Sequence, residues 1–265
     1  MPAADNVADR DLLVHAVRDA GAIAKTAFGT KPKTWEKSKG NPVTETDLAV
    51  NVRLHELLLG ARPGYGWLSE ESADDAERLT KTRVFVIDPI DGTLAFIRDK
   101  PEFTVCAAVS DGGRPVAAAI FNPISEEMFA AALGAGATLN GKPIAVSTTG
   151  ELEWSRMLVA KDVIGHPAWP QAWPAMTVAN RASIAYRMAL VACGQFDSMM
   201  SLSSKHEWDI AAGDLIVREA GGRVTSHTGA ELSYNQPVPR LRSVICAGPA
   251  MHDAILERTR DIKLP

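Results

Sequence analysis

The sequence predicts a soluble protein of the mixed α/β class, and three patterns support this fold class. The apolar run from Val84 to Ile87 has the composition of a strand that is buried on both faces. Strand patterns dominate the chain beyond Thr93, and after about Ser147 strands alternate with helical segments. Such alternation is typical of α/β folds. A chain of 265 residues is long enough for one large domain or two closely packed halves.

Charge and composition limit the partners of this protein. Hydrophobic residues make up 46% and charged residues 23%, as in ordinary globular proteins. A formal net charge of −4 argues against nucleic acid as a partner. No apolar run approaches the length of a membrane span, and the N-terminus lacks a signal-like region, so no membrane partner is expected. Three scattered cysteines among apolar residues indicate reduced thiols and a cytoplasmic location.

Two helices and a polar segment are predicted first. Apolar residues at helical spacing indicate an amphipathic helix from Asp5 to Phe28. The lysine-rich stretch 31–41 is consistent with a solvated linker or with a loop or hairpin that closes over a site. Thr44 is a candidate N-cap of the next helix, with Asp47 at the capping-box position. The pattern alone therefore explains Asp47 as a capping acid.

An acidic pair and a buried strand follow. Pro63-Gly64 is expected to end the second helix, and a short strand from Gly66 then delivers Glu70 and Glu71. By themselves these two acids are typical of a solvated loop. The next strand begins at Arg83 and is expected to end at Asp88-Pro89, because proline cannot donate to the ladder.

The turn after this strand carries the chemistry. Asp88 and Asp91 would stand a few Å apart, which is unfavourable unless a proton or a cation relieves their repulsion. We interpret the pair as a divalent-metal site. Gly92 permits close approach of the backbone to a ligand, and Gly92 and Thr93 at the start of a new helix would offer N–H groups to a phosphate. A hairpin turn is disfavoured because residues 94–97 do not alternate, and an EF-hand calcium loop lacks its ligands.

The rest of the chain is predicted from shorter patterns. Strands are expected at 103–109, 116–121, 128–133, 157–160 and 176–178, with a helix from 183 to 193. A helix from Glu207 is rich in small residues and ends at Gly221-Gly222. Asp209 lies in its first turn, where the helix dipole favours an acid whether or not the residue binds a ligand.

Taken together, three motifs resemble the inositol monophosphatase superfamily. They are Glu70-Glu71-Ser72, Asp88-Pro89-Ile90-Asp91-Gly92-Thr93, and Trp208-Asp209-Ile210-Ala211-Ala212-Gly213 followed by Glu219-Ala220-Gly221-Gly222. The likeness in order and spacing extends from Asp47 to the Gly-Gly pair. It implies a layered α/β/α/β/α sandwich of the sugar-phosphatase type, usually a homodimer. It also implies a magnesium-dependent phosphomonoesterase with two or three Mg²⁺ ions and inhibition by lithium.

The resemblance also implies roles for single residues. Glu70, Asp88 and the Ile90 carbonyl resemble ligands of one metal, while Asp88, Asp91 and Asp209 resemble ligands of a second. Asp47 and Thr93 resemble the pair that orients and deprotonates the attacking water, and Glu70 is included in this catalytic set. The substrate-binding residues implied are Asp91, Gly92, Thr93 and Asp209. Residues 1–147 would form an α+β half with most ligands, and an α/β half, residues 148–265, would complete the site.

This chemistry suits the residue types independently of the resemblance. Hard oxygen ligands suit Mg²⁺, which keeps several waters and binds phosphate oxygens beside a few carboxylates. Two ions together can stabilise the attacking and leaving oxygens of an in-line displacement, so no covalent phospho-enzyme is required.

The substrate is predicted from departures from the inositol pattern. Leu94-Ala95-Phe96 stands where inositol phosphatases generally show Thr-Asn-Phe, and Glu102-Phe103-Thr104-Val105 is similar to 3′(2′),5′-bisphosphate nucleotidases. Asp197 and Glu207 are the nearest acids before Trp208, whereas inositol enzymes generally place a hydroxyl-binding Glu between them. Met199, Met200 and Leu202 would pack against a flat base or simply belong to the core.

We therefore favour hydrolysis of 3′-phosphoadenosine 5′-phosphate to AMP. The alternatives are inositol-1-monophosphatase, then histidinol-phosphate phosphatase or fructose-1,6-bisphosphatase. A non-catalytic regulatory protein is the alternative from another class. A degenerate metal site or a basic surface stripe would indicate that class, and the sequence shows neither.

Overall fold

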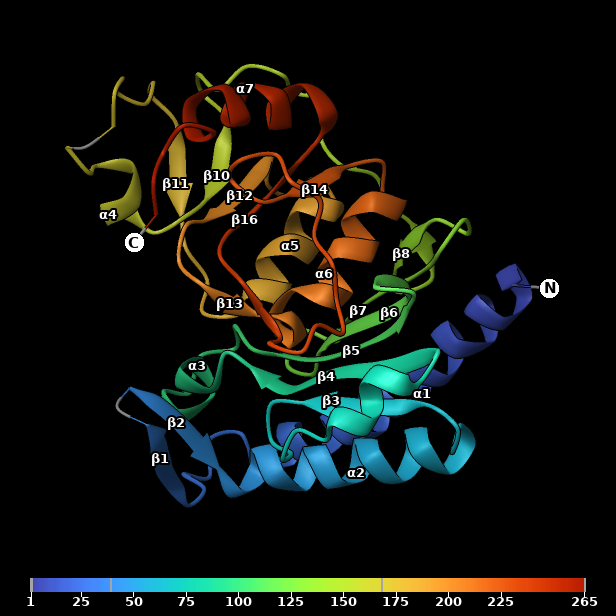
Figure 1. Cartoon of the computed structure of the whole chain (residues 1–265). Coiled ribbons are helices and arrows are strands. Elements are labelled where there is room, and N and C mark those ends of the chain that lie inside the picture. Colours follow the sequence, from blue (N-terminus) through green and yellow to red (C-terminus); the bar gives the residue numbers. More distant parts are fainter. Residues whose placement is uncertain (1, 39, 168, 265) are drawn as a thin grey trace.

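Helices and sheets are stacked in five alternating layers, as Figure 1 shows. This structure is a computed structural model, and it describes residues 2–38, 40–167 and 169–264. From one side to the other, the layers are α1 and α2, a seven-stranded sheet, α5 and α6, a five-stranded sheet, and α7. The predicted α/β/α/β/α sandwich is confirmed.

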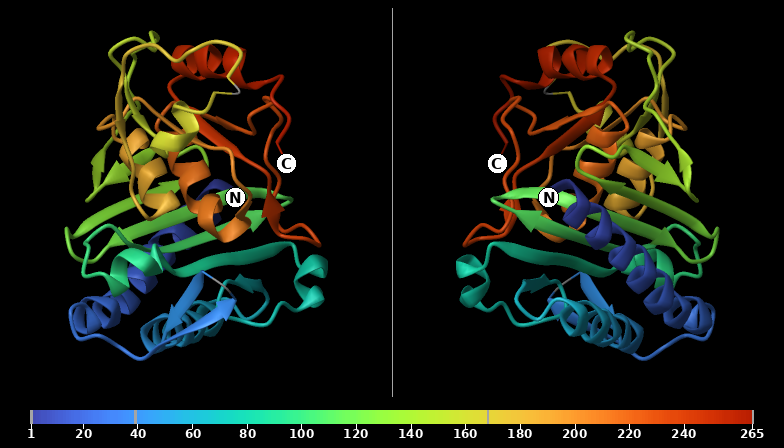
Figure 2. Two further views of the ribbon diagram at one scale, coloured as in Figure 1. Left: turned by 90° about the vertical axis from the view of Figure 1, so that its left-hand side faces the viewer. Right: turned by 90° about the vertical axis from the view of Figure 1, so that its right-hand side faces the viewer.

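The first layer consists of α1 (Pro2–Ala27) and α2 (Glu45–Ala61), which pack on the large sheet. The side views of Figure 2 show both helices, in blue, on the same side of this sheet. The sheet runs in the order β3-β4-β5-β6-β7-β8-β9. Its strands are β3 (Gly66–Ser69), β4 (Arg83–Asp91), β5 (Thr104–Asp111), β6 (Arg114–Asn122), β7 (Glu127–Ala132), β8 (Ala137–Leu139) and β9 (Lys142–Pro143).

Strand β4 is buried on both faces, as its composition predicted. Successive side chains of a strand point to opposite faces. Val84 and Val86 accordingly pack into the core shared with α5 and α6, while Phe85 and Ile87 pack into the core shared with α1 and α2. A strand held from both sides is a rigid support for the residues at its end.

The middle and outer layers come from the second half of the chain. Helices α5 (Ile184–Ala192) and α6 (Glu207–Glu219) pack between the two sheets, and α7 (Pro249–Thr259) covers the small sheet from outside. The small sheet runs in the order β11-β10-β12-β16-β14. Its strands are β10 (Arg156–Leu158), β11 (Thr177–Ala179), β12 (Ser198–Ser201), β14 (Arg223–Thr225) and β16 (Val244–Ala247).

Several shorter elements complete the chain. They are β1 (Thr34–Ser38), β2 (Asn41–Thr44), the 3₁₀ helix η1 (Ala76–Thr80), α3 (Thr93–Ile97), α4 (Lys161–Ile164), β13 (Lys205–His206) and β15 (Arg240–Leu241). No helix in the described ranges combines the length and the apolar character that crossing a bilayer requires. The three cysteines form no disulfide, as predicted.

Two predictions about the chain path are wrong. Strand β4 does not end at Pro89 but runs to Asp91, and its register against β5 shifts between Asp88 and Asp91. Such an irregularity accommodates the missing proline N–H, because a bulged residue has no ladder partner. The solvated-linker interpretation of 31–41 is also wrong, since β1 and β2 pair as an antiparallel hairpin.

Candidate active site

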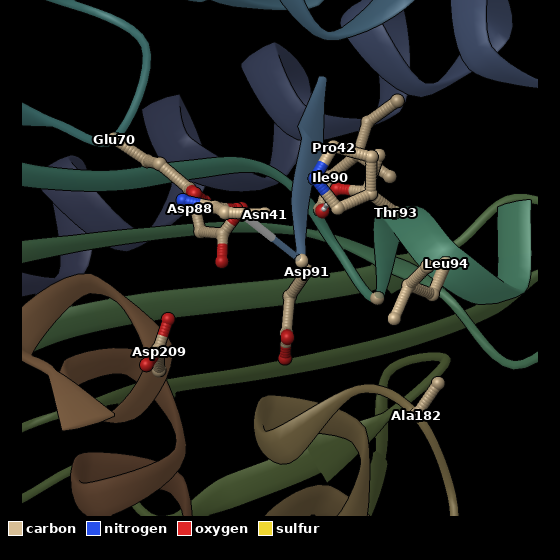
Figure 3. Close-up of a pocket in the computed structure, with 12 residues that line it drawn as sticks. Asn41, Pro42, Glu70, Asp88, Ile90, Asp91, Thr93, Leu94, Ala182 and Asp209 are labelled. Carbon is tan, nitrogen blue, oxygen red and sulfur yellow. Dashed lines mark hydrogen bonds between the residues drawn. The ribbon is translucent and has the colours of Figure 1, made fainter. Parts of the chain in front are cut away.

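The predicted site residues lie together at the end of β4, around a cavity of about 250 Å³. Glu70 follows β3, the Asp88-to-Thr93 segment ends β4 and begins α3, and Asp209 projects from the first turn of α6 (Figure 3). The cavity is thus formed where elements far apart in the sequence meet. The predicted residues that line it are Glu70, Asp88, Ile90, Asp91, Gly92, Thr93 and Asp209.

Asp88 is the most deeply placed acid of this cavity. It is 1% exposed, and its Oδ1 has no hydrogen-bond partner among the described residues. Burial raises the pKa of Asp88 well above its usual value, and the negative charge of Glu70 and then Asp91 raises it further. A buried carboxylate with an unsatisfied oxygen is costly unless a proton or a cation binds it.

Asp91 and Asp209 face the same cavity with more hydrogen-bond support. Asp91 Oδ2 accepts hydrogen bonds from the Ser183 hydroxyl and the Ala185 N–H, both at 2.6 Å, yet burial raises the pKa of Asp91 to about 6. Asp209 Oδ2 accepts the His206 N–H at 2.9 Å, and burial raises the pKa of Asp209 to about 7. The cluster therefore holds more negative charge near neutral pH than its own donors stabilise.

Asp47 combines two functions that the sequence had presented as alternatives. It completes the capping box of α2 with Thr44, and its Oδ2 accepts the Thr44 N–H at 2.9 Å. Its other oxygen, Oδ1, lies 3.1 Å from the Thr93 hydroxyl. Burial raises the pKa of Asp47, which is 1% exposed. The cap holds this carboxylate rigidly in place beside Thr93.

Lys37 is a site residue that the sequence interpretation did not identify. Its Nζ, at the end of the β1–β2 hairpin, lies 2.7 Å from carboxylate oxygens of both Glu70 and Glu71. Burial lowers the pKa of Lys37, but the hydrogen bonds to these acids raise it overall. The only signal in the sequence was the possible hairpin at 31–41. The contact between Lys37 and Glu70 joins residues 33 positions apart, so it leaves no local sequence pattern.

The acidic side chains do not converge on one point as they stand. No three Asp, Glu, His or Cys side chains in the part of the chain that the structure describes are arranged to hold a metal ion. Lys37 engages Glu70, and backbone or hydroxyl donors engage Asp91 and Asp209. The oxygen donors and the unsatisfied Oδ1 of Asp88 nevertheless fit the chemistry of a hard divalent cation.

Gly92 is required by the backbone at the start of α3. Its φ is 98°, a conformation that other residues rarely adopt, and a Cβ there would lie 3.1 Å from the Glu102 carbonyl and 3.2 Å from Ser183 N. The turn that separates Asp91 from Thr93 therefore cannot accept a side chain without distortion.

The two acids that most closely precede Trp208 in the sequence, Asp197 and Glu207, do not line this cavity. Asp197 pairs with Arg156 at 2.8 Å. Glu207 is fully buried and accepts the N–H groups of Asn235 and Gln236 at 2.6 and 2.9 Å. Both carboxylates are thus used to hold loops together.

The layered fold and its acidic cavity define the class of protein as a phosphoric monoester hydrolase of the sugar-phosphatase type. The chain belongs to the inositol monophosphatase family, whose sequence model matches residues 6–264. Members of this family are metal-dependent and act on small phosphorylated substrates.

Individual relatives agree with this assignment over nearly the whole chain. An inositol-1-monophosphatase of Caulobacter vibrioides is 30% identical over 94% of this chain and 99% of its own. The Nus factor SuhB of Escherichia coli is 30% identical, with 95% of each chain covered. Among solved structures, the IMPase of Thermotoga maritima is 26% identical with a TM-score of 0.81, and the match covers 95% of this chain and 96% of that one.

Proposed function

We propose that this protein is a Mg²⁺-dependent phosphatase in which the acidic cavity is the catalytic site. The observation that carries the proposal is the unsatisfied, buried Oδ1 of Asp88 among further acids. Two or three Mg²⁺ ions would be held by oxygens of Glu70, Asp88, Ile90, Asp91 and Asp209. When bound, the ions supply positive charge that neutralises the phosphate and lowers the pKa of a nearby water.

Asp47 and Thr93 are proposed to act on the attacking water. The Thr93 hydroxyl lies 3.1 Å from both Asp47 Oδ1 and the Ile90 carbonyl, so it can accept a hydrogen bond from water while donating to the carboxylate. A proton from the water can then pass through Thr93 to Asp47, whose raised pKa suits a general base. The Gly92 and Thr93 amides would hold the phosphate.

A 3′(2′),5′-bisphosphate nucleotide is our first candidate substrate, with AMP as the product from 3′-phosphoadenosine 5′-phosphate. An inositol leaving group requires partners for several hydroxyls, and neither Asp197 nor Glu207 is available to serve them. One argument for the nucleotide is corrected by the structure. Met199 is fully buried in the core and offers no surface for a base, whereas Met200 and Leu202 line a neighbouring cavity.

Inositol 1-phosphate is the second candidate, and the similarity to the inositol-1-monophosphatase of Caulobacter vibrioides favours it. A regulatory role like that named for the Nus factor relatives is the candidate from another class. The preserved acids at the site support an enzyme instead. We also propose a cytoplasmic homodimer that lithium inhibits, as the resemblance implies.

Phosphate release from a panel of monophosphates and bisphosphates tests this function. We expect turnover with Mg²⁺, loss of turnover with excess chelator and recovery when Mg²⁺ is restored. A tenfold or greater preference for inositol 1-phosphate over 3′-phosphoadenosine 5′-phosphate would replace the first substrate by the second. Absence of turnover on the whole panel would contradict the enzymatic proposal.

A further inference from the structure

A second cavity adjoins the acidic one and carries positive charge. Its volume is about 370 Å³, and Ala182 lines both cavities. Figure 3 places Ala182 at the edge of the acidic cavity, on the side of Asp91 and Leu94. Arg187 of α5 and Lys205 of β13 line the second cavity. The two cavities are therefore neighbours, separated at Ala182.

The hydrogen bonds that these two cations donate go to neutral oxygens. Arg187 Nε donates to the Arg181 carbonyl at 2.6 Å, and Lys205 Nζ donates to the Ser203 hydroxyl at 2.8 Å. Neither forms an ion pair within the described ranges, whereas nearby Arg181 pairs with Glu102. Arg187 and Lys205 thus differ from an ion-paired cation such as Arg181, because their positive charges have no ion-pair partner among the described residues.

Their surroundings make an anion favourable. Arg187 and Lys205 are both half-buried, and burial lowers the pKa of each side chain. The charge of Arg187 also disfavours the charged form of Lys205, which shows that the two side chains repel each other. Asp209 and then Asp91 attract Lys205, and Asp91 and then Glu102 attract Arg187, although none of these described acids forms an ion pair with either side chain. A bound anion would relieve this repulsion with charge-assisted hydrogen bonds.

The polar residues beside them suit a phosphate. The Ser201 and Ser203 hydroxyls and the Asn180 amide line the same cavity, and the described residues that line it include no acid. Hydroxyls and amides supply neutral hydrogen bonds around the two cations, and guanidinium and ammonium groups are the common phosphate binders in proteins.

We propose that Arg187 and Lys205 bind a second phosphate of the substrate while the first is hydrolysed in the acidic cavity. This inference rests on the proposed phosphatase function and names the substrate class as small bisphosphorylated molecules. The second phosphate stays on the product, so these residues select the substrate and take no part in the chemical step.

Matched substrate pairs test the inference. Adenosine 3′,5′-bisphosphate and 3′-AMP share one leaving group and differ only in the second phosphate, as do inositol 1,4-bisphosphate and inositol 1-phosphate. We expect kcat/KM to favour the bisphosphate at least tenfold in one pair. Arg187→Met and Lys205→Met should each reduce this preference about tenfold and change kcat/KM for the monophosphate less than threefold. A ratio measured on one preparation does not depend on the fraction of folded protein.

A binding measurement separates this inference from the chemistry. AMP keeps the second phosphate and lacks the scissile one, so its Kd should rise at least tenfold in both variants when measured by calorimetry. Arg223→Met is the matched control, because exposed Arg223 pairs with Asp253 and neither residue lines either cavity. It should leave both readouts unchanged.

The outcomes distinguish the two proposals. Turnover of monophosphates without preference for either bisphosphate would overturn the second-phosphate site and leave the phosphatase intact. Loss of AMP affinity in both variants without turnover of any substrate would support the second-phosphate site and contradict the phosphatase. Unchanged AMP affinity in both variants would overturn the site whatever the turnover.

Discussion

Replacing Asp88 by Asn should abolish activity and stabilise the metal-free protein at alkaline pH. The carboxylate is buried with an unsatisfied oxygen and lies among other acids, so its charge opposes folding whenever no cation is bound. Asn has nearly the same volume without the charge. Most substitutions of buried residues destabilise a protein, so a gain in stability is a distinctive expectation.

The size of the effect can be judged from Asp91. Burial raises the pKa of Asp91 from 3.8 to about 6, and a shift of about two units corresponds to about 3 kcal/mol. The pKa of Asp88 is raised by burial and by the charges of Glu70 and then Asp91, so the ionised Asp88 opposes folding in the same direction as the ionised Asp91.

The sign follows from linkage. When the pKa of an acid is higher in the folded than in the unfolded protein, the protonated form of that acid stabilises the fold. This stabilisation is lost as pH rises from the unfolded-state pKa through the folded-state pKa. The chelated wild-type protein should therefore lose stability from about pH 4 upward, and Asp88→Asn should lose less. The difference in unfolding free energy between the two proteins should be small at pH 4 and should grow as pH rises to 8, with the figure worked out for Asp91 as its scale.

Urea unfolding in excess chelator at pH 4, 6 and 8 measures this difference directly. A parallel series with Mg²⁺ at 100 times its Kd should stabilise the wild-type protein by about 2.7 kcal/mol. Asp88→Asn should gain much less. A difference between the proteins that does not change with pH would refute the electrostatic argument. Near-native turnover of the variant would show that Asp88 is not an essential metal ligand.

Three further predictions concern the water, the hairpin and the helix packing. Asp47→Asn and Thr93→Ala should each lower kcat by about 10²–10⁴ with little change in Mg²⁺ affinity, and the double variant should lose much less than the product of both effects. If the losses multiply in steady-state kinetics, the two residues do not act as a pair. Lys37→Met should tighten Mg²⁺ binding by up to about fivefold in a calorimetric titration, because the ammonium no longer competes for the acids. Weaker binding would instead mean that Lys37 organises the site. Gly213→Ala should destabilise the fold by about 1–3 kcal/mol in urea, since its Cβ would lie 2.8 Å from Met188. Unchanged stability would show that α5 and α6 can separate freely.

The position of the acidic cavity at the end of β4 was largely predictable from one stretch of sequence. The Asp88-to-Thr93 turn after a buried apolar strand indicated an acidic cavity, because paired carboxylates at a strand exit need a cation. The resemblance then added Asp47, Glu70 and Asp209, and the structure brings them to the same place. Local pattern alone had explained Asp47 as a cap, and the structure shows that it is a cap as well as a partner of Thr93.

The fold class was also predictable, but its later elements were not. The helices before Ala61 and the strands between Arg83 and Ala132 carry long periodic patterns, which the structure confirms apart from their ends. The sequence did not predict three later elements, which are the strands Ser198–Ser201 and Val244–Ala247 and the helix Pro249–Thr259. A buried segment of four residues has too little periodicity to distinguish a strand from a turn.

Contacts between distant segments were decided only by the tertiary structure. The sequence identifies Lys37 as one of several lysines in a polar stretch, and Arg187 and Lys205 as ordinary cations of a helix and a loop. Pairing of the β1–β2 hairpin places Lys37 against Glu70, while the fold brings Arg187 of α5 and Lys205 of β13 to one cavity that none of the described acids lines. Local residue patterns report which side chains share a face, but which charges meet depends on how the layers pack, and the hydrophobic cores set that packing.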